Sequence, residues 1–237
     1  MNNESGKSHG QSSLKYSDGL VDNYTNTRER FNETDSILFS KIHREGGVMG
    51  KRVLDLGCGD GSHAIVLKEM GACEVFGIDI NEAMLRRANQ KLDGVEGVSL
   101  ILANGASLPF QNDSFDFIIS NYVIQYFKDV TKVFAEIGRV LNSGGTFIGT
   151  INVIEVEAGY ENLHNTEIPI RLGSTASPVI VRFFVKSVDE ISMAIENSGL
   201  TVVEEEEMTH PNSVIDESYP HHTHVKKHAM IYTLRKI

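Results

Sequence analysis

The stretch VLDLGCGDG, residues 53–61, places a glycine at every second position after a short apolar run that contains an acid. Glycine gives up side-chain packing and costs backbone entropy, so three glycines this close together indicate a place that needs bare main chain. The apolar residues before them are typical of a buried strand. Residues 62–70 after them favour a helix, and Gly71 is a plausible stop. The sequence therefore predicts a strand, a glycine turn and a helix in succession.

Strands and helices continue to alternate after this first unit. Strand-like runs follow at 73–79, 99–103, 114–123 and 146–153, with helical patterns at 81–92 and 130–141 and a Ser-Gly-Gly break at 143–145. Beyond residue 153 a long segment, 154–186, precedes a helix at 187–199, a strand at 200–207, a polar stretch and a last strand at 228–236. This alternation predicts an α/β fold, with a parallel sheet covered by helices on both faces.

Composition limits the class of protein. With 237 residues, 41% hydrophobic and 23% charged, the chain is expected to be a soluble, globular protein of one domain. Cys58 and Cys73 make no disulfide framework, which favours a cytoplasmic location. The net charge of −10 argues against nonspecific attraction to nucleic acids or anionic membranes. Residues 1–15 are expected to form a flexible polar tail.

A second acid strengthens the prediction of a ligand site. In an open α/β sheet, ligands bind outside the carboxyl ends of the strands, and a glycine turn lets a ligand lie against backbone N–H groups. Asp79 ends the second strand, about twenty residues beyond the glycines, where a carboxylate can accept both ribose hydroxyls of a nucleoside. Ser62 occupies the place of the third glycine in the dinucleotide pattern G-x-G-x-x-G. The sequence therefore favours a nucleoside ligand other than a dinucleotide.

Four motifs in order carry a family resemblance: DLGCGDG, GIDINEAML, an LPF…SFD run and RVLNSGG. Together they resemble the class I S-adenosylmethionine-dependent methyltransferases, most closely the type 11 small-molecule enzymes typified by ubiquinone and menaquinone biosynthesis. The resemblance covers roughly residues 50–152 and implies a Rossmann-like, seven-stranded, mostly parallel sheet with an antiparallel last strand and helices on both faces. It also implies S-adenosyl-L-methionine as cofactor, S-adenosyl-L-homocysteine as product and in-line methyl transfer to a small-molecule metabolite.

The resemblance assigns cofactor contacts by position. Asp55 is expected to organise the turn, Asp79 to hold the ribose hydroxyls, and Ile80 and Met84 to lie against the adenine. Asn104 stands where the family often has Asp, and its carbonyl oxygen can still accept a hydrogen bond from the adenine amino group. The full set of expected cofactor residues is Asp55, Gly57, Cys58, Gly59, Gly61, Asp79, Ile80, Met84, Asn104, Gly105 and Asn121.

The substrate side is expected at the same edge of the sheet. The single domain, 16–237, is divided into N-terminal lid helices (16–50), a cofactor-binding core (51–152), a substrate-side insertion (153–186) and a C-terminal helix and strand pair (187–237). Long connections in compact domains are often functional. The candidate substrate-side residues are Tyr16, Tyr24, Arg28 and Tyr126. The catalytic residues are unknown, with His164, His222 and Tyr126 as candidates.

Several other features have ordinary structural interpretations. The segment from His210 to His228 lacks cysteine or carboxylate partners at ligand spacing, so no metal is expected and a solvated loop is favoured, with a base or substrate contact as the alternative. Cys58 is interpreted as a small residue in a tight turn. The acidic run 204–207 is interpreted as a solvated strand end. Tyr122, Tyr126 and Phe127 either face the acceptor or pack in the core.

Three functions stay open from the sequence. The first is a methyltransferase acting on a small metabolite, a monomer or homodimer with no nucleic-acid or membrane partner; it needs a base only if the acceptor must lose a proton. The second is a nicotinamide-dependent oxidoreductase, against which Ser62 and the LPF…SFD run count. The third is a protein that keeps the cofactor site with lost or altered chemistry, such as a regulator or a cyclase.

Overall fold

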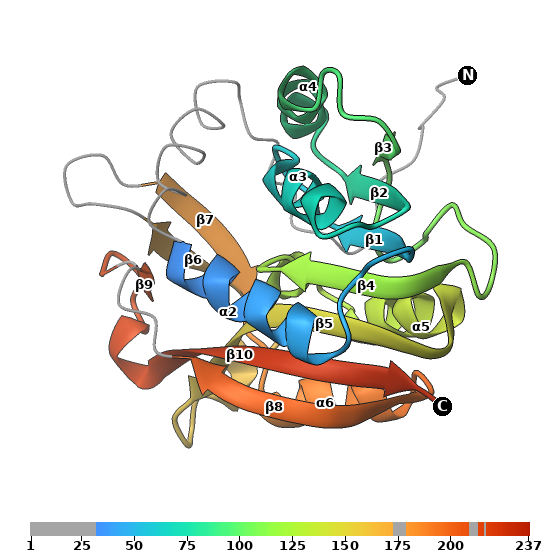
Figure 1. Ribbon diagram of the computed structural model, residues 1–237. Coiled ribbons are helices and arrows are strands. Elements are labelled where there is room, and N and C mark those ends of the chain that lie inside the picture. Colours follow the sequence, from blue (N-terminus) through green and yellow to red (C-terminus); the bar gives the residue numbers. More distant parts are fainter. Residues whose placement is uncertain (1–31, 173–178, 209–212, 216) are drawn as a thin grey trace, which may run out of the picture.

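A seven-stranded sheet forms the centre of the protein (Figure 1). The computed structural model describes residues 32–172, 179–208, 213–215 and 217–237. The sheet has the order β3-β2-β1-β4-β5-β10-β8, and β10 runs antiparallel to both of its neighbours while the other strands run parallel. Its strands are β1 (Arg52–Leu56), β2 (Glu74–Asp79), β3 (Val98–Leu102), β4 (Phe115–Asn121), β5 (Leu141–Val156), β8 (Leu200–Met208) and β10 (Val225–Lys236). The predicted sheet is confirmed, and its strand order reverses between β1 and β4, where open α/β sheets bind ligands.

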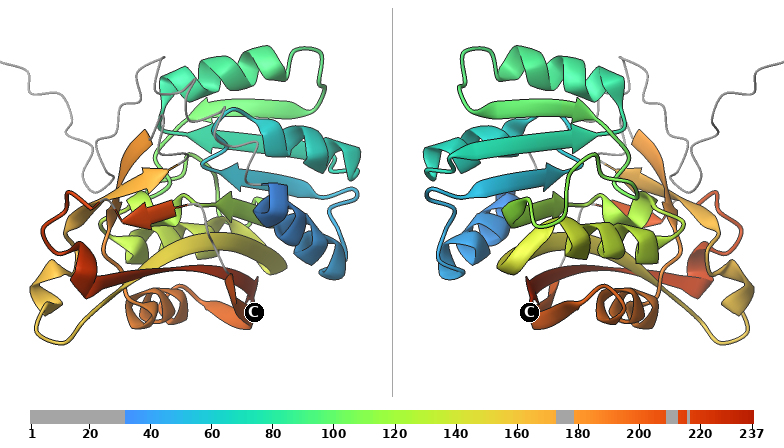
Figure 2. Two further views of the ribbon diagram at one scale, coloured as in Figure 1. Left: turned by 90° about the vertical axis from the view of Figure 1, so that its left-hand side faces the viewer. Right: turned by 90° about the vertical axis from the view of Figure 1, so that its right-hand side faces the viewer.

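Helices cover both faces of the sheet (Figure 2). On one face lie α2 (Asn32–Arg44), α3 (Ser62–Glu69) and α4 (Glu82–Lys91); on the other lie α5 (Val130–Val140) and α6 (Val188–Glu196). Asn81 caps α4, because its Oδ1 accepts the N–H groups of Ala83 at 2.9 Å and Met84 at 3.3 Å. Helix α2 packs onto the sheet through the fully buried Leu38 and Ile42. No helix in the described ranges is long and apolar enough to cross a membrane.

Strand β5 differs from the prediction at both ends. It begins at Leu141, so the expected break at 143–145 lies inside the strand, where the pairing with β4 shifts register and Gly144 takes a φ of 76°. A bulge of this kind accommodates extra residues without ending the strand. At its other end β5 continues to Val156, beyond the last residue of β4, and β10 pairs with it from Val225 onward.

A second, smaller sheet lies at the end of the main sheet toward which β4 and β8 point (Figure 1). It consists of β7 (Val179–Phe184), β6 (Glu167–Leu172) and β9 (Ser213–Ile215), in that order. Ile168, Ile170 and Phe183 are buried in its core together with Val225 of β10. The two long connections predicted from the sequence therefore meet in one antiparallel sheet, which the sequence analysis did not predict.

Candidate functional site

The glycine turn joins β1 to α3 and is crowded by the protein's own side chains. A Cβ atom on Gly57, whose φ is 78°, would lie 2.2 Å from Cγ2 of Val123. A Cβ atom on Gly61, whose φ is 77°, would lie 2.8 Å from Cδ1 of Leu92. Left-handed backbone and close packing both require glycine at these two positions. The predicted need for bare main chain is correct, and part of it comes from the packing of the turn itself.

The N–H groups of the glycine turn donate hydrogen bonds to other groups of the protein. The amides of Gly57 and Cys58 both donate to the carbonyl oxygen of Ile78, at 2.8 and 2.9 Å, and the amide of Gly59 donates to Oδ2 of Asp79 at 2.9 Å. These three amides therefore have acceptors within the protein, and a cofactor contact at residues 57–59, which stays a prediction, would be made by other backbone atoms. A turn whose amides are already satisfied is a poor cradle for phosphate, which depends on such donors.

Asp79 connects the glycine turn to the start of α4. Besides the amide of Gly59, its carboxylate accepts the amide of Asn81 at 2.8 Å through Oδ1. Burial raises the pKa of Asp79 above its usual value, and the backbone hydrogen bonds partly oppose this rise. A carboxylate offers about four acceptor positions, so two remain for hydroxyl donors. Next to it, the apolar side chain of Ile80 is 38% exposed, as expected for a surface against which a flat base can lie.

The turn lies in a negative field. Burial raises the pKa of the Cys58 thiol most, and the charges of Asp55, Asp79 and Asp60 raise it further. Asp60 is paired with Lys91, whose Nζ lies 2.5 Å from its Oδ2. The thiol therefore stays neutral, which agrees with the interpretation of Cys58 as a small packing residue. The same field favours a positively charged ligand.

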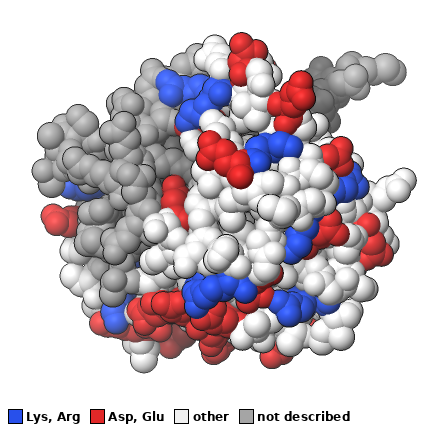
Figure 3. Space-filling model, in the orientation of Figure 1, with Lys and Arg blue, Asp and Glu red and all other residues white. Residues whose placement is uncertain are grey.

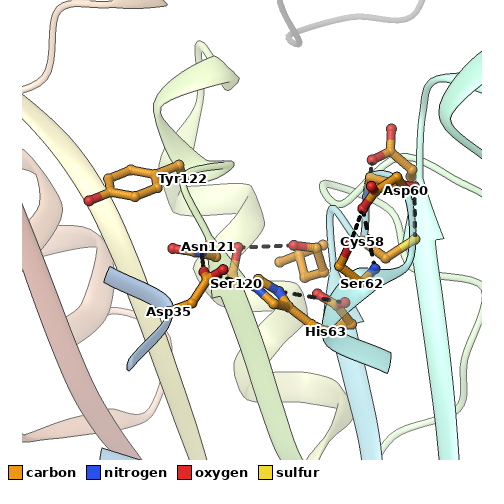
Figure 4. A network of polar contacts seen from close by, with 12 residues as sticks. Asp35, Cys58, Asp60, Ser62, His63, Ser120, Asn121 and Tyr122 are labelled. Atoms are coloured by element: carbon orange, nitrogen blue, oxygen red, sulfur yellow. Dashed lines mark hydrogen bonds and ion pairs between the residues drawn. The ribbon is translucent and has the colours of Figure 1, made fainter. Parts of the chain in front are cut away.

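A chain of polar contacts runs from β1 across the site to β4 (Figure 4). His63, in the first turn of α3, is buried, and its Nδ1 lies 4.0 Å from Oδ2 of the buried Asp55. Its Nε2 lies 3.0 Å from Oδ1 of Asp35 on α2. The same Asp35 oxygen accepts Nδ2 of Asn121 at 2.9 Å. Asp35 of α2 thus links Asn121, at the end of β4, to His63, which in turn lies beside Asp55 of β1. The strand order reverses between these two strands.

The end of β4 is held in an unusual conformation. The hydroxyl of Thr150 donates to Oδ1 of Asn121, so both ends of that amide are bonded within the protein. Tyr122, the next residue, has a φ of 56°, and its N–H lies 3.0 Å from both the carbonyl oxygen and the Oγ1 of Thr150. Its phenol oxygen lies 3.5 Å from Oγ1 of Thr34. Non-glycine residues with such backbone angles are strained and occur preferentially at functional sites.

The remaining expected cofactor residues lie near the ends of β2 and β3. Met84 is buried in the first turn of α4, so only the edge of its side chain is left to contact an adenine base. Oδ1 of Asn104 accepts the amide of Ala106 at 2.9 Å, which uses one of its two lone pairs. Gly105 is buried where a Cβ would lie 2.8 Å from Cδ1 of Leu56.

The candidate catalytic residues lie around the small sheet. Tyr126, in the turn η1 (Ile124–Tyr126), packs edge-on against Phe183 with ring centroids 5.1 Å apart. His164 follows the turn η2 (Glu161–Leu163), and Nδ1 of His222 lies 2.9 Å from the carbonyl oxygen of Tyr219 in the turn before β10. In the part of the chain that the structure describes, neither histidine hydrogen-bonds to Asp35, His63 or Asn121. Tyr16, Tyr24, Arg28 and His210 lie outside the described residues.

In the described part of the histidine-rich segment, His222, His224 and His228 have hydrogen-bond partners within the protein. His224 stacks on Tyr160 with ring centroids 4.0 Å apart, and its Nδ1 lies 2.9 Å from Oε2 of Glu157. His228 bridges Glu207 at 2.5 Å and Glu155 at 3.1 Å. His224 and His228 therefore join strand ends through carboxylates. Among the described residues no group of three or more histidine, cysteine or acidic side chains is placed to hold a metal ion.

The acidic run on β8 also has partners, although Figure 3 shows many acidic side chains gathered over this strand. The buried Nζ of Lys41 on α2 lies 2.7 Å from Glu204 and 3.0 Å from Glu206. Glu204 and Glu206 are 40% and 53% exposed, as the interpretation of a solvated strand end expects, and they also pair with this buried cation. They tie α2 to the edge of the sheet.

Sequence reasoning missed Asp35, His63 and Thr150. The sequence pattern could have indicated His63, because it shares the buried face of α3 with Ala64 and Leu67, where a polar side chain needs a partner. No sequence pattern indicates Asp35, since it lies 28 residues before His63 and belongs to no motif.

Comparison with known proteins agrees with this geometry. Residues 54–149 match a family described as "Methyltransferase domain". A demethylmenaquinone methyltransferase of Staphylococcus aureus (strain MRSA252) is 32% identical over 119 residues, which are 49% of each chain. The chain thus spans about half the length of the curated relatives it matches.

Solved structures share the fold over most of the chain. The PH0226 protein of Pyrococcus horikoshii superposes with a TM-score of 0.63 at 22% identity, covering 89% of this chain and 91% of that one. The cyclase SpnF superposes with a TM-score of 0.59 at 17% identity, covering 96% and 86%. The glycine turn, Asp79 and Asn121 all fall within residues 54–149, the part of the chain that matches the methyltransferase-domain family.

Proposed function

We propose that this protein binds S-adenosyl-L-methionine and transfers its methyl group to a small-molecule metabolite by in-line displacement. The observation that carries the proposal is the negative field at a glycine turn whose amides are already bonded. Burial raises the pKa of Cys58 most, and the charges of Asp55 and Asp79 raise it further. A sulfonium nucleoside with an ammonium group is attracted by this field, whereas the pyrophosphate of a nicotinamide dinucleotide is repelled by it.

The size of this electrostatic discrimination is large. Two unit charges about 5 Å apart interact by about 3 kcal/mol at an effective dielectric constant of about 20. A negatively charged carboxylate at the turn therefore favours a cation over an anion by an energy of this order, less the part that its own partners offset. This argument disfavours the nicotinamide-dependent oxidoreductase.

The residues at the site fit the proposed cofactor. Asp79 would hold the ribose hydroxyls, Ile80 would lie against the adenine, and Asn104 would accept its amino group. Asp35 and Asp55 would favour the cationic end of the cofactor, while Asn121, held by Asp35, would keep the end of β4 beside it. The other cofactor contacts expected from the sequence, at Gly57, Cys58, Gly59, Gly61, Met84 and Gly105, belong to the same proposal.

The cofactor supplies an activated methyl group, so the protein's main tasks are alignment of the acceptor and exclusion of water. The segment 153–186 and the stretch before β10 place the small sheet at the carboxyl edge, where an acceptor would approach. This placement supports a small acceptor held between the small sheet and β4. Tyr126 lies between these elements and stays a candidate for acceptor contact. A cytoplasmic monomer or homodimer is part of the proposal.

A second candidate keeps the cofactor site and changes the chemistry. This chain shares its fold with a protein that is named as a cyclase, not as a methyltransferase. This similarity favours the second candidate, because the same fold there belongs to a protein named for another reaction. Under this alternative the cofactor binds and no methyl group is transferred.

Thermal denaturation with S-adenosyl-L-methionine, S-adenosyl-L-homocysteine and NAD tests the proposal. Both sulfur nucleosides are expected to raise the melting temperature, and NAD is expected to leave it unchanged. A rise with NAD alone contradicts the proposal. Stabilisation by the sulfur nucleosides without methyl transfer to any member of a broad metabolite panel favours the second candidate.

A further inference from the structure

A row of polar side chains continues from Asn121 along the face of the sheet that α2 covers. Asn121 pairs with Thr150 across β4 and β5, and Asn152 follows Thr150 two residues later on the same face. Lys227 of β10 lies opposite Ile154, so its side chain is on this face too, and its Nζ reaches Oδ1 of Asn152 at 3.0 Å. The row runs from the proposed cofactor site toward the small sheet.

Lys227 is a partly buried cation with a neutral partner. Burial lowers the pKa of Lys227 to about 8, and no carboxylate among the described residues opposes this decrease. At neutral pH most molecules still carry the charge. Burying a charge without a counter-ion is costly, so the protein tolerates a destabilising group at this position.

The deeply buried lysines of the described chain have carboxylate partners. Lys41 pairs with Glu204 and Glu206, and Lys186 pairs with Glu190 at 2.6 Å. The neighbouring His228 has two glutamates. Lys227 differs from these two lysines in that it is only partly buried and has an amide oxygen in place of a carboxylate.

We infer that Lys227, positioned by Asn152, binds an anionic oxygen of the methyl acceptor, such as a carboxylate. This inference rests on the proposed function and names the class of its substrate. An ammonium with one amide partner keeps two N–H donors for a ligand. Charge-assisted hydrogen bonds of this kind are about twice as strong as neutral ones.

The positive charge of Lys227 stands out against the acidic charge of the rest of the protein. The chain has a net charge of −10, and the glycine turn is acidic, so an anionic acceptor is repelled by most of the surroundings. A partly buried cation some distance along the sheet from the turn offsets this repulsion at one place. It also orients the acceptor, with its anionic end away from the cationic cofactor and its nucleophilic end toward it.

The test compares Lys227→Met and Lys227→Arg with Lys226→Met, an exposed neighbour on the opposite face of β10. Each protein is first saturated with S-adenosyl-L-homocysteine and then titrated with matched acid and amide pairs: benzoate and benzamide, phenylacetate and phenylacetamide, 4-hydroxybenzoate and 4-hydroxybenzamide, and isovalerate and isovaleramide. For at least one pair the wild type is expected to bind the acid at least tenfold more tightly than the amide.

Lys227→Met is expected to abolish this preference, Lys227→Arg to retain part of it, and Lys226→Met to retain all of it. Equal binding of acids and amides by the wild type overturns the inference, as does an unchanged preference in Lys227→Met. Failure of S-adenosyl-L-homocysteine to bind the wild type would instead refute the proposed function.

Discussion

Nε2 of His63 lies 3.0 Å from Oδ1 of Asp35, and this contact joins α2 to the helix that follows the glycine turn. Because Asn121 donates to the same oxygen at 2.9 Å, Asp35 also fixes the end of β4. The proposed cofactor site is therefore bounded by α2 as well as by the strands. A change in Asp35 should act on both the stability of the protein and the geometry of the site.

Asp35→Ala should lower both the melting temperature and the affinity for the cofactor. It leaves the buried donors of His63 and Asn121 without their acceptor, and each such loss costs about 1–3 kcal/mol. The affinity for S-adenosyl-L-methionine should fall about tenfold, as measured by calorimetry on the folded variant. Asp93→Ala, at an exposed position, is the control and should change neither quantity. If Asp35→Ala resembles this control, the contact has no energetic importance.

Asp79→Ala should weaken binding of S-adenosyl-L-methionine by more than tenfold, because the proposed ribose hydrogen bonds are lost. It should also destabilise the turn, since the amides of Gly59 and Asn81 lose their acceptor. Asp79→Asn keeps one acceptor oxygen and should retain more stability than affinity. Calorimetry and thermal denaturation together separate the two effects. Near-normal affinity in folded Asp79→Ala would count heavily against the assignment.

The affinity for the cofactor should decrease as the pH falls through the raised pKa of Asp79. Burial raises that pKa, so protonation occurs at a higher pH than for an ordinary aspartate, near 3.9. The protonated group accepts the ribose hydroxyls less well, so binding is strongest above this pKa. The sign for folding is opposite: the fold favours the neutral form, so the stability that Asp79 contributes is lost as the pH rises through its pKa. A titration of affinity against pH should show this inflection, above the ordinary aspartate value, in wild type and lack it in Asp79→Asn; its persistence in the variant would assign it to another group.

Gly57→Ala should destabilise the protein more than Gly144→Ala. Both glycines have positive φ values, 78° and 76°, so both variants carry a similar backbone cost. A Cβ on Gly57 also meets Val123 at 2.2 Å, whereas nothing lies within 4 Å of a Cβ on Gly144. Overpacking adds about 1–3 kcal/mol, which urea denaturation can measure. Val123→Ala should partly rescue Gly57→Ala, and equal effects of the two glycine variants would contradict the packing role.

The sequence predicted the local parts of the site well. The glycine turn and Asp79 at its strand end both follow from short-range patterns, and the structure has both. The contacts that complete the site are long-range. Asp35 meets His63 and Asn121 across 28 and 86 residues, and no periodicity encodes such a meeting.

The small sheet was missed for a related reason. Proline is disfavoured inside a sheet, yet β9 pairs with β6 only from Ile170 onward, so Pro169 lies outside the three-stranded part. The acceptors of the N–H groups in the glycine turn, Ile78 and Asp79, were not predicted because the neighbouring strand supplies them. Both the small sheet and the hydrogen bonds of the glycine turn depend on which strands lie side by side, and this is a long-range property of the chain.

Calorimetric titration of the full chain with S-adenosyl-L-methionine and with NAD tests the central claim most directly. An acidic turn with satisfied amides should bind the sulfonium nucleoside with a Kd in roughly the micromolar range and should bind NAD at least a hundredfold more weakly. Tighter binding of NAD, or no heat with S-adenosyl-L-methionine from a folded protein, would contradict the account.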